Sequence, residues 1–124
     1  MVTFGFIKVI MKSYFTSLNS EQEKAVTHTT GPVMVIAGAG SGKTRVLTYR
    51  IVHLIDSGIN PRNILSLTFT NKAAKEMRSR IEEIAGRPNA KNLWMGTFHS
   101  VFSKILRFEA DKLNYPTNFT IYDT

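Results

Sequence analysis

A glycine-rich segment between an apolar run and an amphipathic stretch constrains this chain more than any other feature. Residues 33–37 (VMVIA) are continuously apolar, which is the pattern of a strand buried on both faces. Residues 37–44 (AGAGSGKT) follow, and residues 43–56 then have apolar side chains at helical spacing. In a strand, glycine loop and helix of this kind, backbone N–H groups converge on an anion at the helix N-terminus. The segment therefore predicts a phosphate-binding loop.

The residue types within this loop predict nucleotide and Mg²⁺ binding. Lys43 would reach the β- and γ-phosphates, and the Thr44 hydroxyl would bind Mg²⁺, so both are candidate catalytic residues. The loop departs from the usual G-x-x-x-x-G-K-[ST] pattern only at Ala37, a small residue that also fits the turn. A glycine-rich turn that merely joins a strand to a helix is the alternative, and the Gly-Lys-Thr sequence argues against it. The predicted nucleotide-binding residues of the loop are Ala37, Gly38, Ala39, Gly40, Ser41, Gly42, Lys43 and Thr44.

Strands and helices alternate along the rest of the chain, which predicts an α/β domain with a parallel sheet. Expected strands cover residues 33–37, 64–70 and 93–97, with residues 119–122 as a candidate fourth. Expected helices cover residues 21–28, 43–56, 71–85 and 98–112.

Local signals predict how two of these helices begin and which faces they bury. Ser20 and Glu23 have capping-box spacing, and Asn71 is the expected cap of the helix over 71–85. The predicted inward residues are Leu47, Ile51, Leu54 and Ile55 in one helix and Ala74, Met77, Ile81 and Ile84 in the other.

Composition narrows the classes of function. The 124 residues suit one small domain, and the absence of cysteine excludes disulfide scaffolds and thiolate zinc sites. The net charge of +7 favours a polyanionic partner, and residues 62–107 carry nine basic against three acidic side chains. A non-catalytic nucleic-acid-binding module therefore stays open as an alternative.

The N-terminal residues show neither a signal peptide nor a membrane span. Residues 1–10 are apolar, but Lys8 and Lys12 interrupt them and no small-residue cleavage site follows. We expect a cytoplasmic protein in which residues 1–17 are an extension, either disordered or an added strand over 3–10. Met11 is an alternative start.

Four segments, in order from Leu18 onward, resemble the motifs of the UvrD/Rep/PcrA family of superfamily 1 DNA helicases. They are residues 18–22 (LNSEQ, the Q motif), 37–44 (motif I), 67–77 (LTFTNKAAKEM, motif Ia) and 96–100 (GTFHS, a single-strand contact motif). The resemblance implies a three-layer RecA-like P-loop NTPase domain, with a truncated parallel sheet and flanking helices, that uses ATP and Mg²⁺. It also implies a motor that translocates on single-stranded DNA and unwinds duplex.

The resemblance implies roles for individual residues as well. Gln22 would read the adenine edge and Arg45 would pack against the adenine. Contacts to single-stranded DNA would come from Phe69, Thr70, Asn71, Lys72, Thr97, Phe98 and His99. This agrees with their expected place at the carboxyl edge of a parallel sheet, where ligands bind, and with the use of aromatic and basic groups to hold single strands.

Simpler interpretations of these residues stay open. Phe69 and Phe98 could belong to the core, and His99 could be a helix cap without a ligand. Four basic residues could form an ordinary solvated helix face: Lys72, Lys75, Arg78 and Arg80. We favour this interpretation for Arg78 and Arg80. Trp94 and Tyr49 are read as packing residues.

Phosphoryl transfer also needs a carboxylate that holds Mg²⁺ and cations that stabilise the developing charge. The Asp-Glu pair of the family does not occur in residues 1–124. Residues 121–123 (IYD) only superficially resemble it, since Thr124 follows where a glutamate should be, and they are more similar to a segment that precedes the family's first inserted subdomain. We therefore expect residues 18–124 to be part of a RecA-like domain from a longer helicase, with little ATPase turnover alone. A helicase–nuclease recombination subunit shares these motifs and stays open. A small kinase or GTPase is disfavoured by Gln22 and by the lack of an Asn-Lys-x-Asp run.

Overall fold

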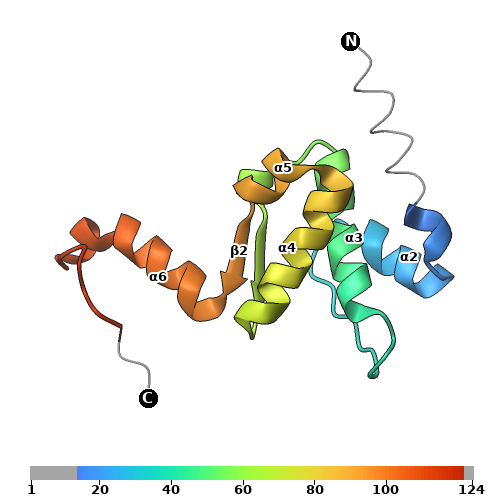
Figure 1. Ribbon diagram of the computed structural model, residues 1–124, viewed down its shortest axis with the longest axis horizontal. Coiled ribbons are helices and arrows are strands. Elements are labelled where there is room, and N and C mark those ends of the chain that lie inside the picture. The colour runs from blue at the N-terminus through green and yellow to red at the C-terminus, as the bar shows by residue number, and fades with distance from the viewer. Residues whose placement is uncertain (1–13, 122–124) are drawn as a thin grey trace, which may run out of the picture.

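The computed structural model describes residues 14–121, which form a mixed arrangement of helices around a small parallel sheet (Figure 1). The elements in chain order are η1 (Tyr14–Ser17), α2 (Ser20–Thr27), α3 (Lys43–Asp56), η2 (Pro61–Asn63), β1 (Leu65–Thr68), α4 (Asn71–Ala85), α5 (Arg87–Asn92), β2 (Trp94–Thr97), α6 (Phe98–Phe108) and η3 (Ala110–Leu113). Of the predicted extension over 1–17, only the last four residues are described, as the 3₁₀ helix η1; the candidate strand over 3–10 lies outside the described residues.

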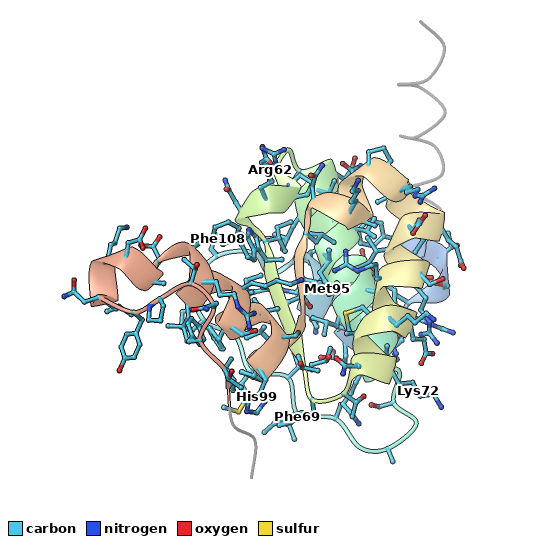
Figure 2. The ribbon with its side chains drawn as sticks, turned by 60° about the vertical axis from the view of Figure 1, so that its left-hand side comes forward. Arg62, Phe69, Lys72, Met95, His99 and Phe108 are labelled. Atoms are coloured by element: carbon cyan, nitrogen blue, oxygen red, sulfur yellow. The ribbon has the colours of Figure 1, made fainter. Side chains whose placement is uncertain are left out.

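Strands β1 and β2 pair in parallel, as the alternation of elements predicts. The register sets Leu65 opposite Trp94 and Thr68 opposite Thr97, and the connection between the strands runs through α4 and α5. Both ribbon views place the two strands between α4 and α6 (Figures 1 and 2). The strands predicted at 64–70 and 93–97 are therefore confirmed, each somewhat shorter than expected.

The core lies where α3 and α4 pack against one another and α4 packs against the sheet. On α4, the predicted inward residues Ala74, Met77 and Ile81 are buried and Ile84 is half-buried. The largest cluster of buried side chains consists of Ile51, Ile64, Met77, Ile81, Ala90, Leu93 and Met95.

The buried face of α3 differs in part from the prediction. Ile51 is buried, but Leu47 is exposed, and Val46 and Val52 are buried instead. Helix α3 packs against α2 as well as α4, and Arg50 Nη1 donates to Ala25 O at 2.6 Å between them. A helix with neighbours on two sides buries a wider arc than the single stripe that sequence periodicity identifies.

The strand predicted over residues 33–37 is wrong for this structure. The segment is irregular and pairs with neither β1 nor β2, and Met34 and Ile36 are 83% and 90% exposed. A strand needs a neighbour that accepts and donates its backbone hydrogen bonds, and none of the described residues supplies one here. An apolar run alone therefore did not suffice to form a strand.

Several element ends also differ from expectation. Helix α6 ends at Phe108 instead of residue 112, since η3 follows, and residues 119–121 form no strand, while Tyr122 lies outside the described residues. Helix α5 was not expected from the sequence. Gly86, with φ of 85°, ends α4 as expected, but Pro88 in the first turn then begins α5, a position that favours proline.

Both predicted caps are displaced by one residue. Asn19, not Ser20, caps α2: its Oδ1 accepts from Gln22 N at 2.9 Å while Gln22 Oε1 accepts from Asn19 N at 3.1 Å. Thr70, not Asn71, caps α4, because its Oγ1 accepts from Ala73 N at 3.1 Å. Adjacent residues in each pair are good caps, and the extended backbone of Asn19 and Thr70 decides between them.

Candidate functional site

The glycine loop ends at the N-terminus of α3 in a conformation that only glycine adopts easily. Gly40 and Gly42 have φ of 75° and 82°, and Gly42 is the N-cap of α3. A Cβ on Gly42 would lie 2.9 Å from Gln22 Nε2, so a side chain there would displace the Gln22 amide from its present position. The loop therefore leads into the positive end of a 14-residue helix, as phosphate binding requires.

Lys43 folds back over this loop. Its Nζ donates to Ala37 O at 3.0 Å and to Gly38 O at 2.6 Å, and the residue is exposed. The ammonium is thus held within the loop by two backbone carbonyls, where a phosphate oxygen could replace them as its partner.

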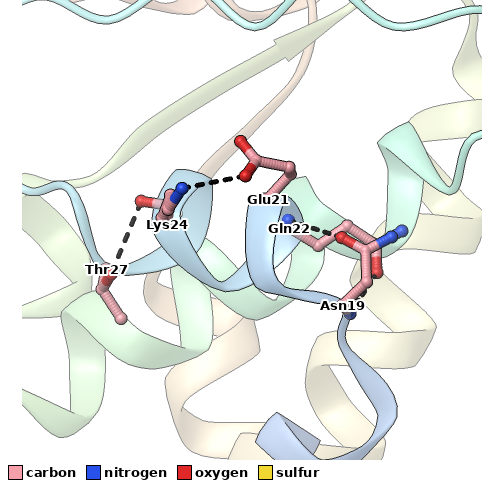
Figure 3. A network of polar contacts seen from close by, with 5 residues as sticks. All are labelled: Asn19, Glu21, Gln22, Lys24 and Thr27. Atoms are coloured by element: carbon pink, nitrogen blue, oxygen red, sulfur yellow. Dashed lines mark hydrogen bonds and ion pairs between the residues drawn. The ribbon is translucent and has the colours of Figure 1, made fainter.

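Gln22 connects α2 to the loop. Its Nε2 donates to Ser41 O at 2.9 Å, while its Oε1 completes the capping box with Asn19 (Figure 3). The same close view shows Glu21 paired with Lys24 at 2.8 Å. That hydrogen bond, and then the charge of Glu21, raise the pKa of Lys24 above its ordinary 10.5. Because both side chains are exposed, this ion pair contributes little to the stability of α2, the helix that positions Gln22.

A pocket of about 450 Å³ opens at the loop. It is lined by Gln22, Gly40, Ser41, Gly42, Lys43, Thr44, Arg45 and Arg80. Three of these side chains are cationic, and no carboxylate is among the described residues that line it. Arg45 also donates from Nη1 to Ser17 O at 3.4 Å. The pocket suits an anion with several negative charges.

Thr44, the predicted Mg²⁺ ligand, is exposed in the first turn of α3. Within residues 14–121, no group of three His, Cys, Asp or Glu side chains could hold a metal ion. Among the residues that the structure describes at this loop, the Thr44 hydroxyl could hold Mg²⁺ together with the oxygens of a bound phosphate.

The second group of predicted residues meets at the carboxyl ends of the strands. Thr68, Phe69, Thr97, Phe98 and His99 line a shallow pocket of about 380 Å³. Figure 2 shows Phe69 and His99 side by side at this edge, with Lys72 beyond them at the start of α4. The pairing of Thr68 with Thr97 explains why the residues that follow each strand come together.

The aromatic rings at this edge face solvent. Phe69 is 94% exposed and Phe98 43% exposed, with ring centroids 5.9 Å apart. The alternative interpretation, that Phe69 and Phe98 belong to the core, is therefore wrong. His99 is exposed and does not cap α6, since Thr97 Oγ1 accepts from Ser100 N at 3.2 Å.

The polar residues of this edge divide into two kinds. The hydroxyls of Thr70 and Thr97 cap α4 and α6, so both helices begin at this edge. Asn71 and Lys72 are exposed in the first turn of α4. The structure thus brings all seven predicted DNA-contact residues to one edge, although two of their side chains already bond the backbone.

Of the two arginines predicted to lie on a solvated helix face, Arg78 differs from that prediction and Arg80 agrees with it. Arg78 is half-buried and donates to Ala90 O at 2.6 Å and to Met95 O at 3.0 Å, so it joins α4 to α5 and β2. Arg80 is exposed and pairs with Glu76 at 2.5 Å, but it also lines the loop pocket. Only the packing of α4 beside α3 could reveal this, since the two elements are distant in sequence.

Trp94 and Tyr49, the two predicted packing residues, are both half-buried. The Trp94 ring meets Phe108 edge-on at 6.4 Å, and Tyr49 packs in the cluster around Val52. Neither residue lines the loop pocket or the strand-end pocket.

None of the helices described over 14–121 is long and apolar enough to span a membrane.

Comparison with known proteins agrees with this arrangement of motifs. Residues 18–124 match the UvrD/REP helicase N-terminal domain. The ATP-dependent DNA helicase PcrA of Staphylococcus epidermidis strain RP62A is 53% identical over 114 residues, which are 91% of this chain and 16% of that protein. The ATP-dependent DNA helicase PcrA of Staphylococcus aureus strain Mu50 is 49% identical over 114 residues, which again are 91% of this chain and 16% of that protein. The chain thus spans about a sixth of the length of these relatives, and it belongs to the UvrD/REP helicase N-terminal domain family.

Proposed function

We propose that this chain is the ATP-binding part of an ATP-dependent DNA helicase that translocates on single-stranded DNA and unwinds duplex. The observation that supports this most is the loop pocket, where Gln22, the glycine loop and three cations meet at the N-terminus of α3. Family membership and the PcrA relatives support the same activity.

In this proposal the loop binds the phosphates of ATP. Lys43 exchanges Ala37 O and Gly38 O for phosphate oxygens, and the loop amides and the α3 N-terminus bind the rest. Gln22 contacts the adenine edge and Arg45 packs against the ring, while Thr44 holds Mg²⁺. Gln22 already touches the loop through Ser41 O, so adenine contact and loop position are coupled through one side chain.

The proposed fold is a three-layer RecA-like P-loop domain. The placement of β1 and β2 between α4 and α6 supports it, because parallel sheets have helices on both faces.

Single-stranded DNA is the proposed partner at the strand-end edge. The exposed Phe69 and Phe98 rings offer stacking surfaces, Asn71 and His99 offer polar contacts, and Lys72 neutralises phosphate. A cytoplasmic location, proposed from the sequence, suits such a motor.

Titration of Mg·ATP into the chain tests the nucleotide site. Lys43→Ala should weaken binding by at least tenfold, because a charge-assisted contact to phosphate is lost. Lys112→Ala is the matched control, since Lys112 is an exposed, ion-paired lysine on η3 away from the loop. Equal affinity of all three proteins would refute ATP binding at this loop.

Steady-state ATPase assays with and without single-stranded DNA test the expected lack of turnover. Without a carboxylate to position water, the rate should stay near background. If DNA bound with the same affinity to wild type and Lys43→Ala, with or without ATP, the non-catalytic nucleic-acid module would be the better description.

A further inference from the structure

A further pocket, of about 490 Å³, lies at the amino end of β2, where the chain passes from α5 into the strand. We call it the amino-end pocket. Figure 2 shows two of its lining residues, Arg62 and Phe108, at the opposite end of the sheet from Phe69 and His99. It shares no lining residue with the loop pocket or the strand-end pocket, so it is a separate feature of the surface.

Positive charge distinguishes the amino-end pocket. Four cationic side chains line it, and no carboxylate does among the residues that the structure describes: Arg62, Arg78, Lys91 and Lys104. They come from four different elements, η2, α4, α5 and α6, and all lie outside the segments that resemble helicase motifs. Packing of distant segments, and not a local run of basic residues, therefore gathers this charge.

Three of these cations are free to bind a ligand. Arg62, Lys91 and Lys104 are exposed, and none of them forms an ion pair with another residue of the described range 14–121. An anion that binds here does not have to displace a carboxylate first.

Arg78 adds charge and holds the pocket together. It is half-buried and donates to Ala90 O at 2.6 Å and to Met95 O at 3.0 Å. A guanidinium group keeps its charge, and two neutral carbonyls do not compensate it. Ala90 precedes Lys91 and Met95 follows Trp94, so the same two hydrogen bonds fix the chain on both sides of the pocket.

The aromatic residues of this pocket contact each other. Phe108 is exposed, but its ring meets the half-buried Trp94 edge-on at 6.4 Å. An edge-on pair uses one ring face for this contact, so it offers less stacking surface than the open Phe69 ring at the strand-end edge. The pocket therefore offers a ligand mostly charge.

A site of this kind favours duplex over single-stranded DNA. Duplex DNA carries one negative charge per about 1.7 Å of its axis, and its bases are stacked inside, so a cationic surface meets the phosphates. The counterion release for each neutralised phosphate is about 0.9 on duplex and about 0.7 on a single strand.

We propose that the amino-end pocket binds the phosphate backbone of duplex DNA. Arg62, Lys91 and Lys104 donate to phosphates, and Arg78 supplies a further positive charge. This goes beyond the proposed function, because it adds a duplex contact at the end of the sheet opposite to the proposed single-strand contacts. Since the two places share no residue, a single strand and a duplex can be bound at the same time.

Fluorescence anisotropy of a labelled, blunt-ended DNA duplex, with the 124-residue chain titrated in at several salt concentrations, tests this. Lys91→Ala and Lys104→Ala should each weaken duplex binding about fivefold or more at low salt, because a charged contact to phosphate is lost. Each should lower the slope of log affinity against log salt concentration by about 0.9, and the double variant by about 1.8. Affinities for oligothymidylate and Mg·ATP should not change.

Matched variants separate this site from net charge and from stacking. Lys91→Arg and Lys104→Arg keep the charge and should bind duplex as wild type does. Lys24→Ala removes the same charge from α2, away from the pocket, and should leave the slope unchanged. Phe108→Ala should leave duplex affinity unchanged. Because Lys91 and Lys104 are exposed, their alanine variants should have a Tm close to that of wild type.

Several results would overturn this inference. They are no duplex binding by wild type at low salt, or wild-type slopes in both Lys91→Ala and Lys104→Ala. Equal losses for oligothymidylate and duplex, or a loss of duplex affinity in Phe108→Ala, would indicate a single-strand site that stacks bases. An equal loss in Lys24→Ala would mean that net charge binds the DNA. If wild type bound duplex as expected but bound no Mg·ATP, the proposed function would fail and this inference would stand.

Discussion

Replacing Phe69 by alanine separates a DNA-contact role from a packing role. Phe69 is 94% exposed, and its ring lies 5.9 Å from the Phe98 ring. A side chain this exposed buries almost no apolar surface, so Phe69→Ala should change the free energy of unfolding by less than about 0.5 kcal/mol.

The expected effect on DNA binding is larger. Stacking of one base on an aromatic side chain contributes about 1–3 kcal/mol, which corresponds to a roughly five- to 150-fold change in Kd. The ring is open to solvent and already touches Phe98, so we expect a value near the lower end, about tenfold. The dependence of affinity on salt should not change, because no charge is removed.

Fluorescence anisotropy with a labelled oligothymidylate at low salt measures this, and thermal denaturation followed by circular dichroism gives stability. Phe108→Ala is the control, since Phe108 is 76% exposed and lies near the other end of α6 (Figure 2). A sharply lower Tm with unchanged affinity per folded molecule would refute the exposed-ring argument. Equal losses in the two variants would refute the assignment of DNA to the strand-end edge.

Four further substitutions test other parts of the structure. Lys72→Ala should reduce the slope of log affinity against log salt concentration for single-strand binding by about 0.7, the value for one neutralised phosphate. An unchanged slope in the same titrations would contradict a phosphate contact. Gly42→Ala should weaken Mg·ATP binding in calorimetry, because φ is 82° and the new Cβ would lie 2.9 Å from Gln22 Nε2; wild-type affinity would argue against this loop geometry. Arg78→Ala should destabilise the fold by about 1–3 kcal/mol in urea unfolding, since two carbonyls lose their donor, whereas a solvated arginine would cost nothing. Ile81→Ala, at a fully buried site, should cost about 2–5 kcal/mol in the same assay, and a much smaller loss would mean that α4 does not pack as described.

The sequence alone was sufficient for features that depend on neighbours along the chain. The bounds of α3 and α4 agree with prediction, because helical periodicity, caps and terminal glycines act within a few residues. The convergence of the residues after β1 and β2 also followed from sequence, since parallel strands end at the same edge. The roles of Gln22, Lys43 and Phe69 toward ligands stay predictions that the experiments above test.

Tertiary structure decided what depends on residues distant in the sequence. Residues 33–37 have the composition of a strand, but a strand forms only where another segment accepts its hydrogen bonds. Alternation of apolar residues could not tell whether Phe69 faces the core or solvent. Arg78 and Arg80, two residues apart on one helix, differ because Arg78 donates to carbonyls of α5 and β2, whereas Arg80 pairs with Glu76 and lines the loop pocket. Helix spacing determines the direction of each side chain, whereas the identity of its partner depends on how helices and strands pack in three dimensions.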